Sequence, residues 1–308
     1  MKILILGGSG MLGHRLWIQL QKHHDVWITV RGSASDFSDV PEFPREKIRT
    51  DVDARNFEQV SRALASIQPE LVINCIGMIK QHGHVAKDPL IAITLNSLFP
   101  HRLSLLCKVA NIRLIHISTD CVFSGKKGNY TEEDIADSDD IYGRTKYLGE
   151  VEYDHCVTLR TSIIGPEIKN GLGLVEWFLT QNETANGFTH AIFSGVTTDE
   201  LSRIINDYVI PNPDLSGKYH VSAQPISKYE LLKLLNVAFN KEVTINPYAD
   251  IVIDRSLNSD RFRLATGYTP PTWEDMIEEM AGSINFYERI NTRIPRLIYF
   301  ANKFTPEG

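Results

Sequence analysis

The first thirteen residues place the tightest constraint on the fold. Residues 2–6, Lys-Ile-Leu-Ile-Leu, are a short apolar run typical of a buried strand. Glycines follow at once at Gly7, Gly10 and Gly13, and leucines then recur every four residues from Leu12. A strand, a glycine turn and a helix in this order are typical of a phosphate-binding turn, because the helix N-terminus directs its N–H groups at an anion.

This turn has the spacing Gly-x-x-Gly-x-x-Gly and is expected to hold a pyrophosphate. Gly7 and Gly10 let the backbone bend toward the ligand, and the phosphates are expected at the first helical residues, Met11 and Leu12. Gly13 lets the helix pack closely on the strand. The alternative is a glycine turn that binds nothing.

The next two strands are expected to surround the adenosine end of a dinucleotide. The strand at 26–30 ends at Arg31, where a basic residue accommodates the 2′-phosphate of NADP and an acid would favour NAD. We therefore predict NADP as the preferred cofactor, with NAD as the alternative. The third strand, 48–52, ends in Asp51 and Val52, which are expected to contact the edge and the face of adenine.

The fourth strand ends in Cys75-Ile76-Gly77, a second glycine turn that is expected to lie under the dinucleotide. A helix is predicted over residues 89–110, with Asn96 inside it. Asn96 is assigned to the cofactor site with two roles left open: it orders a proton path, or it satisfies a backbone group.

The fifth strand runs into small hydroxyl residues, Ser118 and Thr119, as a buried parallel strand does at a ligand crevice. Tyr142 and Lys146 follow, four residues apart and thus on one face of a helix. A neighbouring cation is expected to favour the phenolate and to lower the tyrosine pKa from about 10. Without its context, a Tyr-x-x-x-Lys pair is more often part of a solvent-exposed helix face with no catalytic role.

Strands and helices alternate through residue 166, which predicts an α/β fold with a doubly wound parallel sheet of the Rossmann type. Residues 1–166 are expected to form the dinucleotide-binding domain, with 190–225 returning to its sheet. Residues 167–308 are expected to form mainly a smaller C-terminal substrate-binding lobe. Helices are predicted at 174–179, 199–210 and 228–239, and strands at 191–195 and 217–222.

Several strings together resemble a known family. The turn at 7–13, Ser118-Thr119-Asp120, Tyr142-x-x-x-Lys146 and Leu159-Arg160-Thr161-Ser162 are similar to those of an extended short-chain dehydrogenase/reductase. The string from His116 to Gly125, with Ile141-Tyr-Gly-Arg-Thr-Lys146, resembles the dTDP-4-dehydrorhamnose reductase family. The resemblance spans the chain, strongly to residue 166 and loosely beyond it.

The resemblance implies NADPH-dependent reduction of the 4-keto group of a nucleotide-linked 6-deoxy sugar, in the synthesis of surface polysaccharide precursors. It implies a catalytic set of Thr119, Tyr142 and Lys146, in which Tyr142 gives the proton and Lys146 also holds the nicotinamide ribose. Ser118 is assigned to the cofactor. The residues assigned to the substrate are Thr119, Asp120, Trp177, Arg255 and Ser259.

Two departures from the family pattern concern the sugar. Ser256 stands where the family has proline after the arginine, and residues 78–87 do not match the usual sequence. The alternatives are an NAD-dependent nucleotide-sugar epimerase and a non-catalytic NADP-binding regulatory subunit. Arg255, Arg261 and Arg263 are read as a pyrophosphate-binding cluster or as ion pairs with nearby acids.

The composition of the chain limits which binding partners and which cellular compartment we expect. A net charge of −6 does not favour nucleic acid, and no stretch of 18 apolar residues predicts a membrane span. No signal peptide is recognised, and the four cysteines are widely spaced, so a cytoplasmic protein is expected. His82, His84 and His101 lack a metal-ligand spacing, so no metal is predicted. A homodimer is left open, and the apolar and basic tail, 284–303, is expected to pack on its own lobe.

Overall fold

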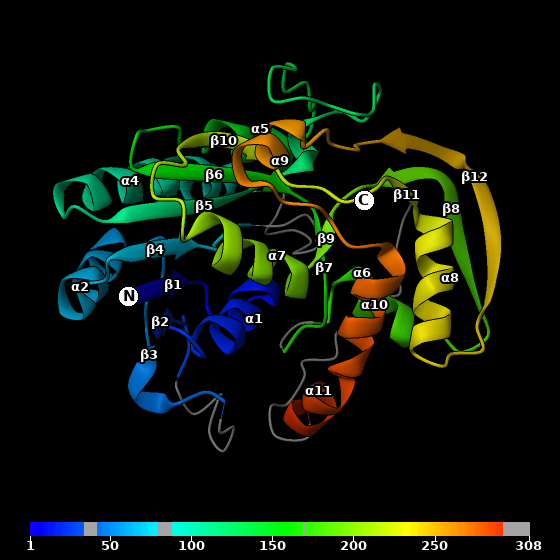
Figure 1. The fold of residues 1–308 in the computed structure, drawn as a ribbon, viewed down its shortest axis with the longest axis horizontal. Coiled ribbons are helices and arrows are strands. Elements are labelled where there is room, and N and C mark those ends of the chain that lie inside the picture. The colour runs from blue at the N-terminus through cyan, green and yellow to red at the C-terminus, as the bar shows by residue number, and fades with distance from the viewer. Residues whose placement is uncertain (34–41, 79–87, 169–170, 292–308) are drawn as a thin grey trace.

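The computed structural model describes residues 1–33, 42–78, 88–168 and 171–291, with side chains described as far as Tyr287. Its centre is a seven-stranded sheet in the order β10-β6-β5-β4-β1-β2-β3, with every pair parallel (Figure 1). The strands are β1 Lys2–Leu6, β2 Asp25–Thr29, β3 Ile48–Arg49, β4 Leu71–Asn74, β5 Arg113–Thr119, β6 Cys156–Thr161 and β10 Gly217–His220.

This strand order confirms the predicted doubly wound sheet. The order of winding reverses beside β1, so β1 and β4 flank the switch point where such sheets bind their ligands. The third strand is shorter than predicted, because only Ile48 and Arg49 pair with β2.

Helices cover both faces of the sheet. Ile3 and Ile5 pack in one hydrophobic cluster with the residues of α1 and α7, whereas Leu4 and Leu6 pack in a second cluster with those of α2 and α4. Burial on both faces explains why β1 reads as an unbroken apolar run. These helices are α1 Met11–Leu20, α2 Phe57–Ile67, α4 Phe99–Val109 and α7 Thr198–Ile204.

The predicted helix at 89–110 is confirmed, and it contains a wider turn. It begins as α3 (Pro89–Ala92), passes through a π-helical segment (Ile93–Leu98) and continues as α4. Pro100 has no N–H, so it cannot donate the usual helical hydrogen bond to the carbonyl of Asn96 in the wider segment. The whole run has the length of a membrane span, 21 residues at a mean hydropathy of 1.3, but half of its apolar window is buried within the protein, as in a core helix.

A second, smaller sheet lies beside the first (Figure 1). Its order is β11-β8-β12, and helix α8 packs against β8 and β12. The predicted strand at 191–195 is the end of the longer β8, and β12 was not predicted, because none of its residues is buried and its pattern does not alternate. These elements are β8 Thr184–Phe193, β11 Ile226–Ser227, β12 Thr244–Asp254 and α8 Lys228–Ala238.

The chain passes from the central sheet to the second sheet, returns to the central sheet at β10 and then goes back to the second sheet. Two short strands, β7 and β9, pair in parallel, and β10 returns to the edge of the central sheet beside β6. The predicted helices at 199–210 and 228–239 are present, and Ser227 caps the second by accepting from the N–H of Glu230 at 3.1 Å. The remaining elements are β7 Ile163–Ile164, β9 Val196–Thr197, α5 Ile141–Leu148, α6 Leu174–Leu179, α9 Asp260–Thr266, α10 Trp273–Gly282 and α11 Ile284–Asn291.

The first part of the C-terminal tail was expected to pack on its own lobe. It contacts α10 there, and Tyr287 also contacts His14 of α1, in the predicted dinucleotide-binding part. Tyr287 of α11 is buried in the main hydrophobic cluster, and Phe286 packs against it. Residues 292–308, which include the rest of the apolar and basic tail, lie outside the described residues.

Candidate active site

The glycine turn has the close approaches that the sequence predicts. Gly7 adopts a φ of +84°, and the N–H of Gly10 donates to its carbonyl oxygen at 3.0 Å. A Cβ on Gly13 would lie 2.2 Å from the same oxygen, so only glycine lets α1 come this near to β1. Gly10 is the N-cap of α1 and has no side chain. No side chain at this position therefore stands between a ligand and the N–H groups of Met11 and Leu12. This cradle fits a pyrophosphate.

The end of β4 lies against this turn. A Cβ on Gly7 would be 3.1 Å from Cγ1 of Ile76 and 3.4 Å from the carbonyl carbon of Cys75. Gly77 lies near Lys146, with 3.9 Å from its ideal Cβ position to Nζ. The two glycine turns and the predicted lysine are therefore neighbours at the carboxyl edge of the sheet.

Asn96 holds this second turn in place. Its side-chain oxygen accepts from the N–H of Met78 at 2.7 Å, and its Nδ2 donates to the Met78 carbonyl and to Oγ1 of Thr145, each at 3.2 Å. Of the two roles left open, the structure shows the satisfaction of backbone groups. The stretch after Met78, including His82 and His84, lies outside the described residues.

The residues predicted for the adenosine end lie at the ends of β2 and β3. Arg31 is exposed and close enough to Asp53 to lower the pKa of that carboxyl, a smaller effect than the hydrogen bond from Arg55. Val52 is buried, and its N–H donates to Val30 at 3.1 Å. Asp51 is exposed with a left-handed φ of +56°.

Tyr142 and Thr119 meet as predicted. The Tyr142 hydroxyl shares a hydrogen bond with the Thr119 side chain, which also accepts from the N–H of Cys121 at 3.1 Å. Asp140 caps the helix that carries the tyrosine by accepting from Gly143 at 2.8 Å. The phenol thus turns inward to the end of β5.

Lys146 lies one helical turn further and is almost fully buried. Its Nζ donates to the carbonyl of Ile117 on β5 at 2.7 Å. Burial lowers its pKa to about 8, against the opposing effect of the Glu150 carboxylate and the Cys75 thiol. At neutral pH most of this lysine is charged, and the charge is lost as the pH rises through about 8.

The expected lowering of the tyrosine pKa is not what the structure shows. Burial raises the pKa of Tyr142, and the nearby Cys121, Asp120 and Asp140 act in the same direction, while the Thr119 hydrogen bond opposes them. Lys146 does not offset this, because its ammonium is directed at a backbone carbonyl. The phenol is consequently protonated at neutral pH, the form that gives a proton away.

A buried ion pair supports the same strand and was not predicted. Ser118, expected at the cofactor, donates its hydroxyl to Oε1 of Glu150 at 2.7 Å. Glu150 also receives Nε and Nη2 of Arg160 at 2.6 and 2.7 Å, and both charged side chains are buried. The sequence has no local signal for this pair, because Arg160 reaches Glu150 from the neighbouring strand β6.

The residues assigned to the substrate divide into two groups. Asp120 is buried beside Thr119. Arg255, just after β12, donates to the carbonyl of Phe123 at 2.8 Å and approaches Cys121 Sγ at 3.9 Å. Burial raises the pKa of Asp120, and the charge of Arg255 opposes that effect.

The other two residues assigned to the substrate, Ser259 and Trp177, pack against other parts of the protein. Ser259 is buried, with its hydroxyl 3.0 Å from that of Ser222, and Trp177 is a partly buried residue against the main cluster. The three arginines do not converge: Arg261 faces Glu133 at 3.8 Å, and Arg263 donates to the Ser222 carbonyl at 3.4 Å.

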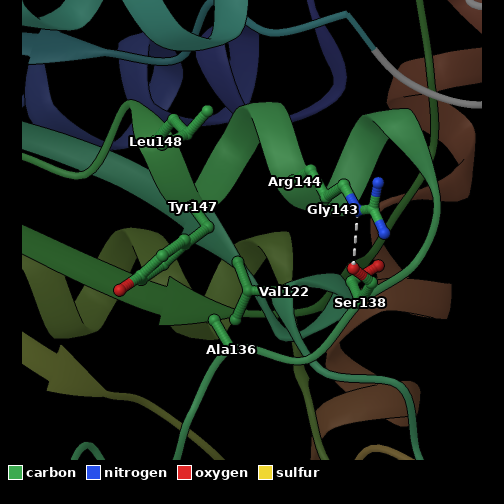
Figure 2. Close-up of a pocket in the computed structure, with 7 residues that line it drawn as sticks. All are labelled: Val122, Ala136, Ser138, Gly143, Arg144, Tyr147 and Leu148. Carbon is green, nitrogen blue, oxygen red and sulfur yellow. Dashed lines mark hydrogen bonds between the residues drawn. The ribbon is translucent and has the colours of Figure 1, made fainter.

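The opposite face of α5 carries a small cavity of about 190 Å³ (Figure 2). Arg144 crosses one end of it and donates to the carbonyl of Ser138 at 3.2 Å, while Tyr147 and Leu148 form the other end. Tyr142 and Lys146 do not line it. The helix therefore separates this cavity from the predicted catalytic pair.

The sheet, the glycine cradle and the Thr119–Tyr142–Lys146 arrangement define an extended short-chain dehydrogenase/reductase. The comparison with protein families is more specific. The chain belongs to the family described as "RmlD substrate binding domain", whose model matches residues 1–285.

Individual relatives are distant. The chain is 27% identical over 257 residues to methionine adenosyltransferase 2 subunit beta of Mus musculus, covering 78% of this chain and 72% of that one. It is 24% identical to dTDP-4-dehydrorhamnose reductase of Aggregatibacter actinomycetemcomitans, covering 91% and 98%. A solved dTDP-4-dehydrorhamnose reductase from Bacillus anthracis, in complex with NADP, superposes with a TM-score of 0.74 at 24% identity, covering 91% and 98%.

Proposed function

We propose that this protein reduces the 4-keto group of a nucleotide-linked 6-deoxy sugar with NADPH. The single observation that carries the proposal is the inward-facing Tyr142, hydrogen-bonded to Thr119 at the carboxyl edge of the sheet. Membership of the RmlD substrate binding domain family and the likeness to dTDP-4-dehydrorhamnose reductases support it. The same support extends to a cytoplasmic role in making surface polysaccharide precursors.

The residues around the glycine turn fit a dinucleotide, and we assign its binding mainly to residues 1–166. Gly7, Gly10 and Gly13 leave room for the pyrophosphate, and Arg31 favours the 2′-phosphate of NADP over NAD. Residues 167–308 contribute mainly to the sugar nucleotide, with Arg255 directed at the end of β5. Trp177 and Ser259 keep their assignment to the substrate lobe as a prediction.

The nicotinamide, when bound, supplies the hydride. Thr119 holds the carbonyl oxygen of the sugar, and Tyr142 gives its proton to that oxygen as negative charge develops. The raised pKa of Tyr142 keeps the proton in place until then. Lys146, charged below about pH 8, is assigned to hold the nicotinamide ribose, and Tyr142 regains its proton from water after the transfer.

The Tyr142→Phe variant tests this assignment. It removes the proton donor and keeps the ring, so we expect a loss of about two to four powers of ten in kcat. NADPH affinity, measured by fluorescence titration, should stay near that of the wild type. Wild-type turnover by the variant on the same sugar nucleotide would rule out the role of Tyr142.

A second candidate is a non-catalytic NADP-binding regulatory subunit, favoured by the similarity to methionine adenosyltransferase 2 subunit beta. The intact Thr119, Tyr142 and Lys146 set argues against it, since a purely regulatory chain does not need a positioned proton donor. Affinity capture decides between the two: a stoichiometric partner, together with no ketone reduction on a panel of sugar nucleotides, would favour the regulatory subunit.

A further inference from the structure

The C-terminal helix reaches the phosphate-binding turn through one buried histidine. His14, on α1, is fully buried one helical turn after Gly10. Its Nδ1 lies 2.8 Å from the carbonyl oxygen of Gly10, and its Nε2 lies 2.9 Å from the hydroxyl of Tyr287 on α11. The rings of His14 and Tyr287 also meet edge to face, with centroids 5.6 Å apart.

The direction of these hydrogen bonds follows from the chemistry of the groups. A carbonyl oxygen only accepts, so Nδ1 of His14 must carry the proton and donate to Gly10. Burial lowers the His14 pKa to about 4, so the ring is neutral and Nε2 has no proton. Nε2 therefore accepts, and the Tyr287 hydroxyl donates to it. By donating to Nε2, the phenol stabilises the histidine tautomer that donates to the Gly10 carbonyl.

The hydrogen bond from His14 fixes the orientation of the Gly10–Met11 peptide in the glycine turn. The Gly10 carbonyl accepts from the backbone N–H of His14 at 3.2 Å as well as from the imidazole. In a planar trans peptide the following N–H, that of Met11, points the opposite way. Holding the carbonyl inward therefore holds the Met11 N–H outward, toward the place expected for the pyrophosphate.

Phe286, the neighbour of Tyr287 on α11, also packs toward α1. Phe286 meets Phe43 edge to face at 6.4 Å, and Phe43 stacks on Trp17 of α1 at 4.7 Å. Arg15 adds a hydrogen bond to the Tyr287 hydroxyl and pairs with Asp199 of α7. Tyr287 lies beyond residue 285, where the match to the family model ends.

We propose that Tyr287 is a positioning residue for the pyrophosphate-binding turn, acting through His14 on the Gly10–Met11 peptide. The C-terminal helix then contributes to cofactor affinity without touching the cofactor. This inference rests on the proposed NADPH site and adds a support that lies more than 270 residues away in sequence.

The test is NADPH titration of the full chain carrying Tyr287→Phe, followed by protein fluorescence. Loss of one buried hydrogen bond should weaken binding about 3- to 10-fold. The KM for NADPH should rise by the same factor, while kcat at saturating NADPH stays within about twofold of wild type. A purely structural role would not produce this split.

The matched control is Tyr268→Phe. Tyr268 is equally buried and donates its hydroxyl to Glu200 at 2.9 Å, away from the glycine turn. Its loss should lower stability to urea much as Tyr287→Phe does, yet leave the NADPH Kd unchanged. A third variant, His14→Phe, should weaken binding at least as much as Tyr287→Phe, and adding Tyr287→Phe to it should change little further.

Each outcome decides the matter. Unchanged affinity in Tyr287→Phe, equal losses in the Tyr268→Phe control, or fully additive effects of His14→Phe and Tyr287→Phe would each overturn the inference alone. Wild-type protein that does not bind NADPH would overturn the proposed cofactor and this inference together. Wild-type binding without sugar reduction would remove the proposed reaction and leave the inference standing.

Discussion

At the scale of single residues, burial governs the chemistry of the site more than neighbouring charges do. The sequence places a phenol and an ammonium one turn apart and predicts that the cation lowers the tyrosine pKa. In the structure Lys146 is directed at the Ile117 carbonyl, and desolvation shifts both groups: the pKa of Tyr142 rises and that of Lys146 falls to about 8. Side-chain direction within the helix face decides this, and spacing does not reveal it.

The lowered pKa of Lys146 predicts a limit at high pH. The active form carries the charge, which exists below the pKa, so kcat/KM should be level near neutrality and fall as pH rises through about 8. The fall should approach tenfold per pH unit. Steady-state rates from pH 6 to 10 measure this, with circular dichroism as the control for folding. A level profile to pH 10 would contradict the assignment.

At the scale of elements, α5 and the residues after it are fastened to β5 at three successive positions. Lys146 bonds to Ile117, Glu150 to Ser118, and Tyr142 to Thr119. Tyr142 and Lys146 are four residues apart on one face of α5, and Glu150 lies just beyond the C-cap of the helix. These contacts place the Tyr142 phenol at the end of β5. The buried Glu150–Arg160 pair holds the same strand through the hydrogen bond of Ser118 to Glu150.

Breaking that pair should be costly. The Arg160→Met variant leaves the Glu150 carboxylate buried without its partner, and we expect the free energy of unfolding to fall by about 3–5 kcal/mol. The matched variant Arg62→Met removes a guanidinium from an exposed pair with Glu58, which should cost far less. Urea denaturation followed by circular dichroism measures both. Equal losses would show that the buried pair does not hold the element in place.

At the scale of the whole molecule, the sequence predicts the central sheet well and the second sheet poorly. Strands β1 and β4 of the central sheet are short apolar runs buried on both faces, and a glycine turn follows each of them. Strand β12 is half exposed and contains Pro247, so its pattern gives no such signal. Contacts that join distant segments, such as Tyr287 with His14, have no periodicity at all.

The same distinction applies to the candidate site. Gly7, Gly10, Tyr142 and Lys146 stand in short motifs whose spacing carries their geometry. The support behind them does not: Glu150 and Arg160 meet because β6 lies beside β5, and Ser259 is turned to Ser222 by the start of α9. Such residues are recognised only once the strands have an order.

The central claim, that NADPH is consumed to reduce a sugar ketone, has one direct measurement. Wild-type protein is incubated with NADPH and a nucleotide-linked 4-keto-6-deoxy sugar, and loss of the reduced nicotinamide absorbance is compared with the amount of sugar alcohol formed. We predict one NADPH oxidised for each sugar reduced. Conversion of the sugar at constant NADPH, as an epimerase with recycled cofactor would show, or no conversion at all would contradict the account.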